Sequence, residues 1–331
     1  MKKKYQNIFF TAGVAFFVLM VTQLDFEEVA AGVNRAGYWF IAVVALWAVL
    51  YVFNTTAWWM VINSSTNDHK LHGWGAFLWL YKITVSGFSL NYATPGGLMG
   101  GEPYKIMSLS PKIGTESATA SVILHTMTHI FSHFWFWLIA CGLFVLTEPI
   151  NVFMAILLLA ITFFCLTAIW FFLKGYKKGI ARSLILILSK IPGARKRAQH
   201  FIERHNEELT EIDRQIAALH NQNPRTFVGA VSLELSCRLV SALEIFFILL
   251  VVMPEANYVV CVLILAFTSL VANMLFFIPL QLGGREGGFL MSVGGLGMTA
   301  STGIFVALLV RLRELIWTGI GLLLIRLEKH R

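Results

Sequence analysis

Long stretches without a charged residue dominate the pattern of hydrophobic and polar positions. Four of them contain no Asp, Glu, Lys or Arg, namely 38–62, 118–146, 150–173 and 256–282. Each has at least the roughly 20 residues that a helix needs to cross about 30 Å of hydrocarbon. Because backbone groups find no water in lipid, such segments form helices that satisfy their own hydrogen bonds.

Three further stretches, at 8–24, 226–252 and 304–325, are shorter or interrupted by charges, and we expect them to span as well. The pattern predicts an all-α, polytopic transmembrane helical bundle of about 6–8 spans. Composition agrees, because only 13% of the 331 residues are charged, against about 25% in soluble domains. Strands of alternating polarity, which a membrane β-barrel requires, are absent from the sequence.

The net charge of +8 comes largely from basic clusters beside apolar segments, at 2–4 and at 174–197. Such clusters mark cytoplasmic flanks, so we expect no nucleic-acid partner, a bacterial cytoplasmic (inner) membrane location and a cytoplasmic N-terminus. To keep 174–197 inside, the segment 74–107 must enter and leave on one side as a re-entrant hairpin. The same count of membrane crossings places the C-terminus outside, although its basic residues favour the inside. Either the last segment folds back as two short helices, or another piece of the chain spans the membrane.

We expect one integral membrane domain with a first half at 1–173 and a second half at 226–331. A cytoplasmic connector at 174–225 joins them, and its part at 195–221 has the narrow apolar stripe of an amphipathic helix. The four cysteines lie in apolar segments without metal-binding spacing, which is typical of small core residues.

Two glycine-rich motifs interrupt the hydrophobic pattern: TPGGLMGGEPYK at 94–105 and IPLQLGGREGGF at 278–289. Glycine and proline at this density do not continue a helix. At membrane depth, irregular backbone is tolerated only where protein buries it or water reaches it, and in transporters broken helices mark binding sites. The motifs share a proline, a Gly-Gly pair and a glutamate beside a base, as an internal repeat would leave. They predict two re-entrant or broken helices; the alternative is two tight loops between spans.

Ionisable residues inside the apolar segments are candidate functional groups, because charge at membrane depth is costly. Glu234 and Arg238 are one turn apart, a spacing that allows an ion pair, while Glu244 faces another direction. Such a pair would be structural or functional. Arg311 and its neighbour Arg313 would neutralise Glu286 or hold a phosphate, since the guanidinium fork suits both.

Three histidines, His125, His129 and His133, recur every four residues along one predicted helix. They lie near one face, where imidazoles could bind a metal, relay protons, contact a lipid phosphate or form a hydrogen-bonded helix contact. The chain lacks the additional ligands of a di-iron desaturase. We therefore predict no metal and no other cofactor.

The two motifs carry a resemblance to a known family. The first resembles the Pro-x-x-Gly-Gly-x-Gly-Glu element of the lysylphosphatidylglycerol synthase transmembrane region, and the second is similar to its Pro-Gly-Gly-Leu-Gly-x-Arg-Glu element. The stretch 308–312, followed by Gly319 and Gly321, resembles the arginine-bearing last span. The similarity covers about residues 5–327. It implies internal pseudo-symmetry, re-entrant helices and a role in moving lipids between leaflets.

Two features qualify this resemblance. Fused members carry a soluble aminoacyl-transferase domain, whereas only 328–331 follow the last segment here, so we expect a stand-alone member without synthase activity. After the first motif, the family usually has an acidic–Arg pair with an Asp three residues on. This chain has His125, Thr126 and His129 there, which changes the charge pattern of the first half.

The function predicted is a flippase-like protein, not an enzyme, that moves or binds an anionic phospho- or isoprenoid-linked lipid. Its expected substrate-binding residues are those of the motifs and the arginines of the spans: Gly96, Gly97, Gly100, Gly101, Glu102, Lys105, Arg238, Gly283, Gly284, Arg285, Glu286 and Arg311. Its expected coupling or polar network comprises Glu234, Glu244, His125, His129 and His133. One alternative is an intramembrane metalloenzyme using the histidines. Another is an accessory subunit that docks envelope-biosynthesis proteins through the connector.

Overall fold

The computed structural model describes residues 18, 26–64, 71–92, 100–175, 207, 210, 213, 214, 224–274 and 284–327. Within these ranges the regular structure is entirely helical, which confirms the predicted all-α bundle. The expected span at 8–24 and the amphipathic helix at 195–221 lie outside the described residues, apart from isolated positions.

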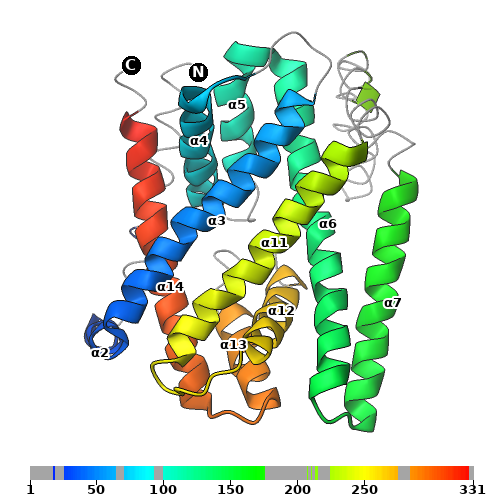
Figure 1. Ribbon diagram of the computed structural model, residues 1–331. Coiled ribbons are helices and arrows are strands. Elements are labelled where there is room, and N and C mark those ends of the chain that lie inside the picture. The colour runs from blue at the N-terminus through cyan, green and yellow to red at the C-terminus, as the bar shows by residue number, and fades with distance from the viewer. Residues whose placement is uncertain are drawn as a thin grey trace, which may run out of the picture.

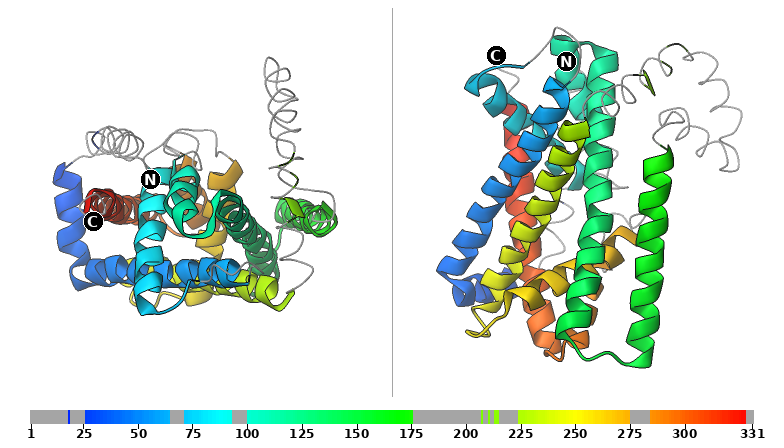
Figure 2. Two further views of the ribbon diagram at one scale, coloured as in Figure 1. Left: turned by 90° about the horizontal axis from the view of Figure 1, so that it is seen from above. Right: turned by 45° about the vertical axis from the view of Figure 1, so that its right-hand side comes forward.

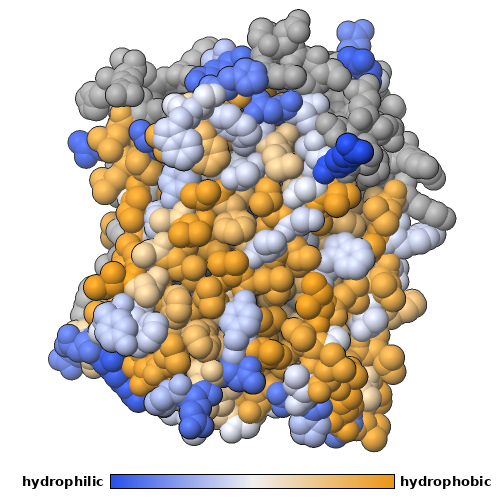
Figure 3. All heavy atoms as spheres, in the orientation of Figure 1, coloured by the Kyte–Doolittle hydropathy of each residue, from blue (hydrophilic) through white to orange (hydrophobic). Residues whose placement is uncertain are grey.

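Long helices form the frame of the bundle. Three of them reproduce predicted apolar segments and are long and apolar enough to cross a membrane: α3 (Tyr38–Asn63), α6 (Thr115–Thr147) and α7 (Val152–Gly175). Two others, α11 (Pro224–Leu249) and α14 (Ala300–Leu327), are equally long but carry charges. Helix α7 stands beside α6 at the edge of the bundle (Figure 2), with 11% of its apolar window buried. The face in Figure 3 shows a hydrophobic belt between more hydrophilic ends, as a lipid environment requires.

Two pairs of shorter helices fill the interior from opposite ends. Helices α4 (Trp74–Tyr92) and α5 (Gly101–Ile113) pack together in the upper half of Figure 1, and α12 (Tyr258–Met274) and α13 (Gly284–Gly295) pack together in the lower half. The segment 256–282 was predicted as a full span, but α12 has only 17 residues, fewer than the roughly 20 needed. Residues 275–283 of that prediction lie outside the described residues.

This second pair corrects the expected position of the C-terminus. Because α12 and α13 both lie in the lower half, α14 starts at the lower end of the bundle and runs upward (Figure 1). It is one continuous helix from Ala300 to Leu327 and does not fold back. Helix α14 thus ends at the same end of the bundle as α3 and α7. The predicted connector was expected to start at this end, after α7, so the basic Arg326 in the last turn of α14 is no longer in conflict with the expected sidedness.

The order of long helix, short pair, long helix occurs twice, in α3–α6 and again in α11–α14. Helices α3 and α11 run antiparallel along each other, while α4 packs on α14 and α12 packs on α6. Equivalent contacts recur in the two halves with the opposite direction across the bundle, the arrangement expected of an inverted repeat. Helix α2 (Phe26–Ala36) lies crosswise at the lower end and packs on α14 and α3.

The contact between α4 and α14 depends on a glycine and two serines. A Cβ atom on Gly321 would lie 2.6 Å from the Cβ of Ser89 and 2.9 Å from the carbonyl oxygen of Val85. The hydroxyl of Ser86 donates to the Gly321 carbonyl at 3.2 Å, and that of Ser89 donates to the Trp317 carbonyl at 3.0 Å. Small residues and hydroxyl hydrogen bonds are what hold membrane helices together, since apolar burial gives little preference over lipid.

Replacing Gly321 with alanine should therefore destabilise the bundle. The added methyl group meets backbone as well as side chain, and overpacking of this kind costs about 1–3 kcal/mol. The matched control is Gly142→Ala in α6, where a Cβ meets nothing within 4 Å. Thermal unfolding in detergent, followed by circular dichroism, should show a lower Tm for Gly321→Ala only. Equal Tm values for the two variants would contradict the packing described here.

Candidate functional site

A cavity of about 310 Å³ lies between the two halves, and the last residues of α4 and α12 and the start of α13 line it. Asn91 and Tyr92 line it from the end of α4, and Asn273 lines it from the end of α12. Arg285, the second residue of α13, lines it as well, and its guanidinium carbon is 5.8 Å from the centre of the Tyr92 ring. Tyr92 beside the first glycine-rich motif and Arg285 within the second are thus brought together, although they are almost 200 positions apart.

The wall of the cavity combines aromatic and charged side chains. The long helices α3, α6, α11 and α14 contribute to it together with α4, α12 and α13. The aromatic members are Trp47, Phe88, Tyr92, Phe136 and Phe289. The charged members are Glu234, Arg238, Glu244, Arg285 and Arg313, alongside His129 and His133.

Arg313 and Glu244 form a fully buried ion pair between α14 and α11. The guanidinium donates from Nε at 2.7 Å to one carboxylate oxygen and from Nη2 at 3.0 Å to the other. The indole Nε1 of Trp47 donates to the same carboxylate at 3.0 Å, and the guanidinium lies 3.7 Å from the Trp47 ring centre. This two-bond geometry is the strongest form of such a pair, and it joins α3, α11 and α14.

Two further arginines of the second half are paired as well. Arg285 forms an ion pair with Glu314, and Arg311 forms one with Glu286. The neutralisation of Glu286 by Arg311 is one of the two arrangements that the sequence allowed. Neither Arg311 nor Glu286 is among the residues that line the cavity, and a direct contact with substrate stays a prediction for both.

Arg238 differs from these three arginines. Its Nε donates to the Ser132 hydroxyl and its Nη2 donates to the His129 carbonyl, both at 2.8 Å. The ion pair with Glu234 that the spacing allowed does not form, because the Glu234 carboxylate turns towards α6 instead. Within the described part of the chain, no carboxylate forms an ion pair with Arg238. Its guanidinium therefore lines the cavity without a carboxylate in direct contact, and the nearest opposite charge is the Glu234 carboxylate one turn earlier on α11.

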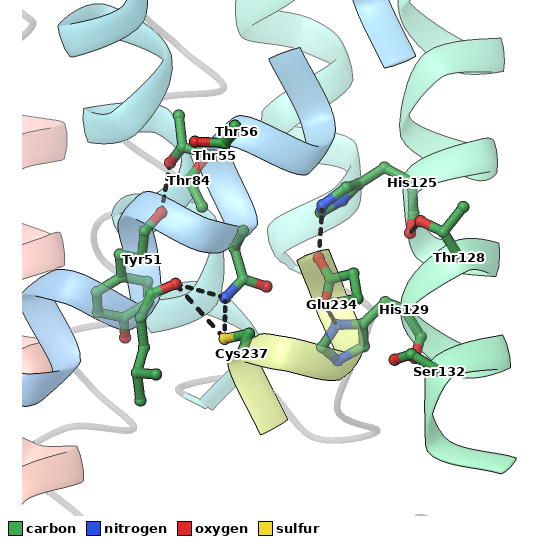
Figure 4. A network of polar contacts seen from close by, with 12 residues as sticks. Tyr51, Thr55, Thr56, Thr84, His125, Thr128, His129, Ser132, Glu234 and Cys237 are labelled. Atoms are coloured by element: carbon green, nitrogen blue, oxygen red, sulfur yellow. Dashed lines mark hydrogen bonds and ion pairs between the residues drawn. The ribbon is translucent and has the colours of Figure 1, made fainter. Parts of the chain in front are cut away.

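Glu234 is shared by two histidines of α6 (Figure 4). Its carboxylate lies 2.8 Å from Nδ1 of His129 and 3.3 Å from Nε2 of His125, and Glu234 is 1% exposed. The His133 ring centre is 5.5 Å from that of His129. His129 thus forms a hydrogen-bonded contact between α6 and α11, while the other roles proposed for the three histidines stay predictions. No group of three His, Cys, Asp or Glu side chains with metal-binding geometry occurs among the described residues.

The first glycine-rich motif builds the joint between α4 and α5. The Gly101 amide donates to the Asn91 side chain at 2.8 Å, and the Asn91 amide donates to Glu102 at 3.1 Å. Lys105, 2% exposed, lies 3.6 Å from Glu102 and 5.0 Å from the centre of the Phe88 ring. Glu102 and Lys105 are near the cavity without lining it.

The glycines predicted to bind substrate have different positions. Gly100 and Gly101 begin the α5 region, and Gly284 is buried at the start of α13. Gly96, Gly97 and Gly283 lie outside the described residues. Direct binding of a ligand by these glycines stays a prediction.

Sequence reasoning missed several lining residues: Trp47, Asn54, Asn91, Tyr92 and Asn273. The amides carried a usable signal, because an asparagine within an apolar helix needs a polar partner. Arg313 was noted beside Arg311, but residues two positions apart lie on nearly opposite sides of a helix. The sequence alone therefore could not tell which of the two faces the cavity.

Breaking the Arg313–Glu244 pair should be costly. Glu244→Gln leaves a buried guanidinium without its counter-charge, and loss of one partner of such a pair costs about 3–5 kcal/mol. Glu116→Gln, at an exposed glutamate at the start of α6, is the matched control. Thermal unfolding in detergent should show a large loss of stability for Glu244→Gln alone, and Glu244→Leu combined with Arg313→Leu should recover part of it. A stability of Glu244→Gln equal to the control would contradict the pairing.

Comparison with known proteins agrees with the resemblance carried by the two motifs. No curated protein and no solved structure matches the chain. The model of the family described as lysylphosphatidylglycerol synthase TM region matches residues 7–321. This family is a membrane domain of lipid-related proteins, and the match covers nearly the whole sequence. The chain therefore belongs to the lysylphosphatidylglycerol synthase TM region family.

Proposed function

We propose that this protein is flippase-like and moves an anionic lipid across the bacterial cytoplasmic membrane, with the lipid headgroup held in the cavity between its two halves. The observation that carries the proposal is the environment of Arg238. It lines the cavity, and its hydrogen bonds go to a hydroxyl and a carbonyl group. Arg285 and Arg313, by contrast, have carboxylate partners.

A guanidinium without a directly bonded carboxylate is unfavourable in a water-poor interior, and an anionic ligand in contact with it relieves that cost. Arginine has five N–H donors, and two of those on Arg238 are used in the bonds described above. The remaining donors form a planar edge suited to the oxygens of a phosphate. A phosphodiester or an isoprenoid-linked phosphate supplies such oxygens.

The dimensions and the walls of the cavity support a lipid headgroup rather than a whole lipid. Its volume of about 310 Å³ is at the lower end of the range for small-molecule sites. A headgroup fits this space, while acyl or isoprenoid chains would stay in the surrounding hydrocarbon. In transporters with inverted repeats, the substrate site likewise lies where broken helices meet at the repeat interface.

Two further expectations belong to this proposal. The short pairs α4–α5 and α12–α13 would be re-entrant, each entering the membrane from one side and returning to it. The basic connector would face the cytoplasm together with the N-terminus and would be available to envelope-biosynthesis proteins. The first expectation is supported by the position of the two short pairs at opposite ends of the bundle in Figure 1, and the second by the basic flanks in the sequence.

Arg238→Gln should abolish lipid movement without unfolding the protein. The test uses phosphatidylcholine vesicles that contain the purified full chain and NBD-labelled phosphatidylglycerol, with dithionite to reduce the label in the outer leaflet. For the wild type we expect the fluorescence that is protected in protein-free vesicles to be lost at a protein-dependent rate. In Arg238→Gln this rate should be at least about tenfold lower, because a charge-assisted contact worth about 1.4 kcal/mol or more is lost. Arg238→Lys should retain part of it.

Arg326→Gln is the matched control, because Arg326 is exposed at the end of α14. Its vesicles should behave like the wild type. Wild-type movement in Arg238→Gln vesicles, or a wild type that leaves the probe as protected as in protein-free vesicles, would contradict the proposal.

A further inference from the structure

We propose that Glu234 with His125 and His129 forms a proton site, and that one proton is taken up for each anionic headgroup bound at Arg238. The inference rests on the proposed function and names the second ligand of the same cavity. It starts from a feature that lipid binding alone leaves unused: a buried carboxylate shared by two imidazoles, beside an arginine without a carboxylate partner.

The hydrogen-bond geometry defines where a proton adds. His129 Nδ1 lies 2.8 Å from the Glu234 carboxylate, so in the neutral ring Nδ1 carries the hydrogen that the carboxylate accepts. Nε2 is then the basic nitrogen. The His129 side chain is 31% exposed and lines the cavity, whereas those of His125 and Glu234 are almost fully buried. A proton that arrives through the cavity therefore meets His129 first, and Glu234 stabilises the imidazolium that results.

The charges explain why a proton and an anion should bind together. With neutral imidazoles, the negative charge of Glu234 offsets the positive charge of Arg238 in the same low-dielectric region, and an added anion would leave an excess of negative charge. Once one imidazole is protonated, it offsets Glu234, and the charge of Arg238 is available to the anion. Because net charge is costly in such surroundings, the empty site favours neutral imidazoles and the occupied site favours one imidazolium.

The proton site and the anion site also share one turn of α6. Arg238 donates to the backbone carbonyl of His129 and to the hydroxyl of Ser132, and that hydroxyl donates to the same carbonyl at 2.7 Å. The position of the guanidinium is therefore tied to the residue that carries the basic imidazole. A shift of Arg238 towards a bound anion would be transmitted to His129 through two hydrogen bonds.

The other charged groups around this cluster have partners of their own. They are Glu244 with Arg313, Arg285 with Glu314 and Lys105 with Glu102. Cys237 contacts Asn54, and His133 Nδ1 is buried without a hydrogen-bond partner among the described residues. Helices α3 and α12 contribute no Asp, Glu, Lys or Arg. The cluster of side chains whose net charge can change with pH thus consists of Glu234, the histidines and Arg238.

The experiment measures proton uptake on binding. The full chain in detergent is titrated with dihexanoyl phosphatidylglycerol, a phosphodiester whose charge stays constant between about pH 6 and 8. Calorimetry in buffers of different ionisation enthalpy then gives the protons taken up per ligand. For the wild type we expect about one proton above the imidazole midpoint, and an affinity that falls about tenfold per pH unit there.

Three variants separate the proposal from a merely structural cluster. Glu234→Gln removes the opposing carboxylate, and it should bind the probe both below and above the imidazole midpoint without proton uptake. The double variant His125→Gln/His129→Gln should take up no proton. It should bind the probe weakly both below and above the imidazole midpoint, because Glu234 still offsets the charge of Arg238. Glu116→Gln, exposed and remote, should keep the wild-type pH dependence.

Binding by the wild type without proton uptake, or pH dependence retained in Glu234→Gln, would overturn the proton site and leave the proposed function standing. If the wild type fails to bind the probe both below and above the imidazole midpoint, both proposals are overturned. The same holds if Arg238→Gln binds the probe as well as the wild type. The Glu234→Gln and double-histidine results are expected to differ in affinity, so misfolding of one variant does not reproduce the pattern.

Discussion

The requirement that charges be paired inside a water-poor bundle governs this structure. The pair of Arg313 with Glu244 satisfies it most completely, with two direct hydrogen bonds, a third from Trp47 and almost no exposure. It ties α14 to α11 and α3, three helices from both halves. With Arg313 and Arg285 held by carboxylates, the cavity retains one guanidinium that lacks such a partner, Arg238. The position of a candidate anion site thus follows from how the other charges are paired.

The two halves repeat one architecture but contribute different chemistry to the cavity. The guanidinium groups come from α11, α13 and α14 of the second half, whereas α6 of the first half contributes imidazoles and a hydroxyl. The sequence already departed from the family pattern at His125 and His129, in the span after the first motif. In the structure these residues face Glu234 of the other half. An inverted repeat whose halves have diverged can hold an anion with one half and a proton with the other.

Composition and periodicity were sufficient to predict the helical class, the long spans and the family, because these depend on apolar length and local motifs. They were insufficient where the outcome depends on which side chain faces which helix. Glu234 and Arg238 have the spacing of an ion pair, yet each turns to a different group on α6. The apolar stretch at 256–282 is long enough to span, but α12 ends after 17 residues. Tertiary contacts decide such cases, and a single sequence does not contain them explicitly.

The pattern of helix contacts also limits how the cavity can open. Helix α4 of the first half is held against α14 of the second by the contact of Gly321 with Ser89 and by hydroxyl hydrogen bonds, and α12 of the second half packs on α6 of the first. Each short pair is therefore anchored to the opposite half, and rocking the halves as rigid bodies would break these contacts. At the inner ends of the short pairs, Arg285 forms an ion pair with Glu314 of α14, and Asn91 is hydrogen-bonded to Gly101 and Glu102 of α5. Opening the cavity would therefore require contacts between a short pair and the opposite half to break or exchange.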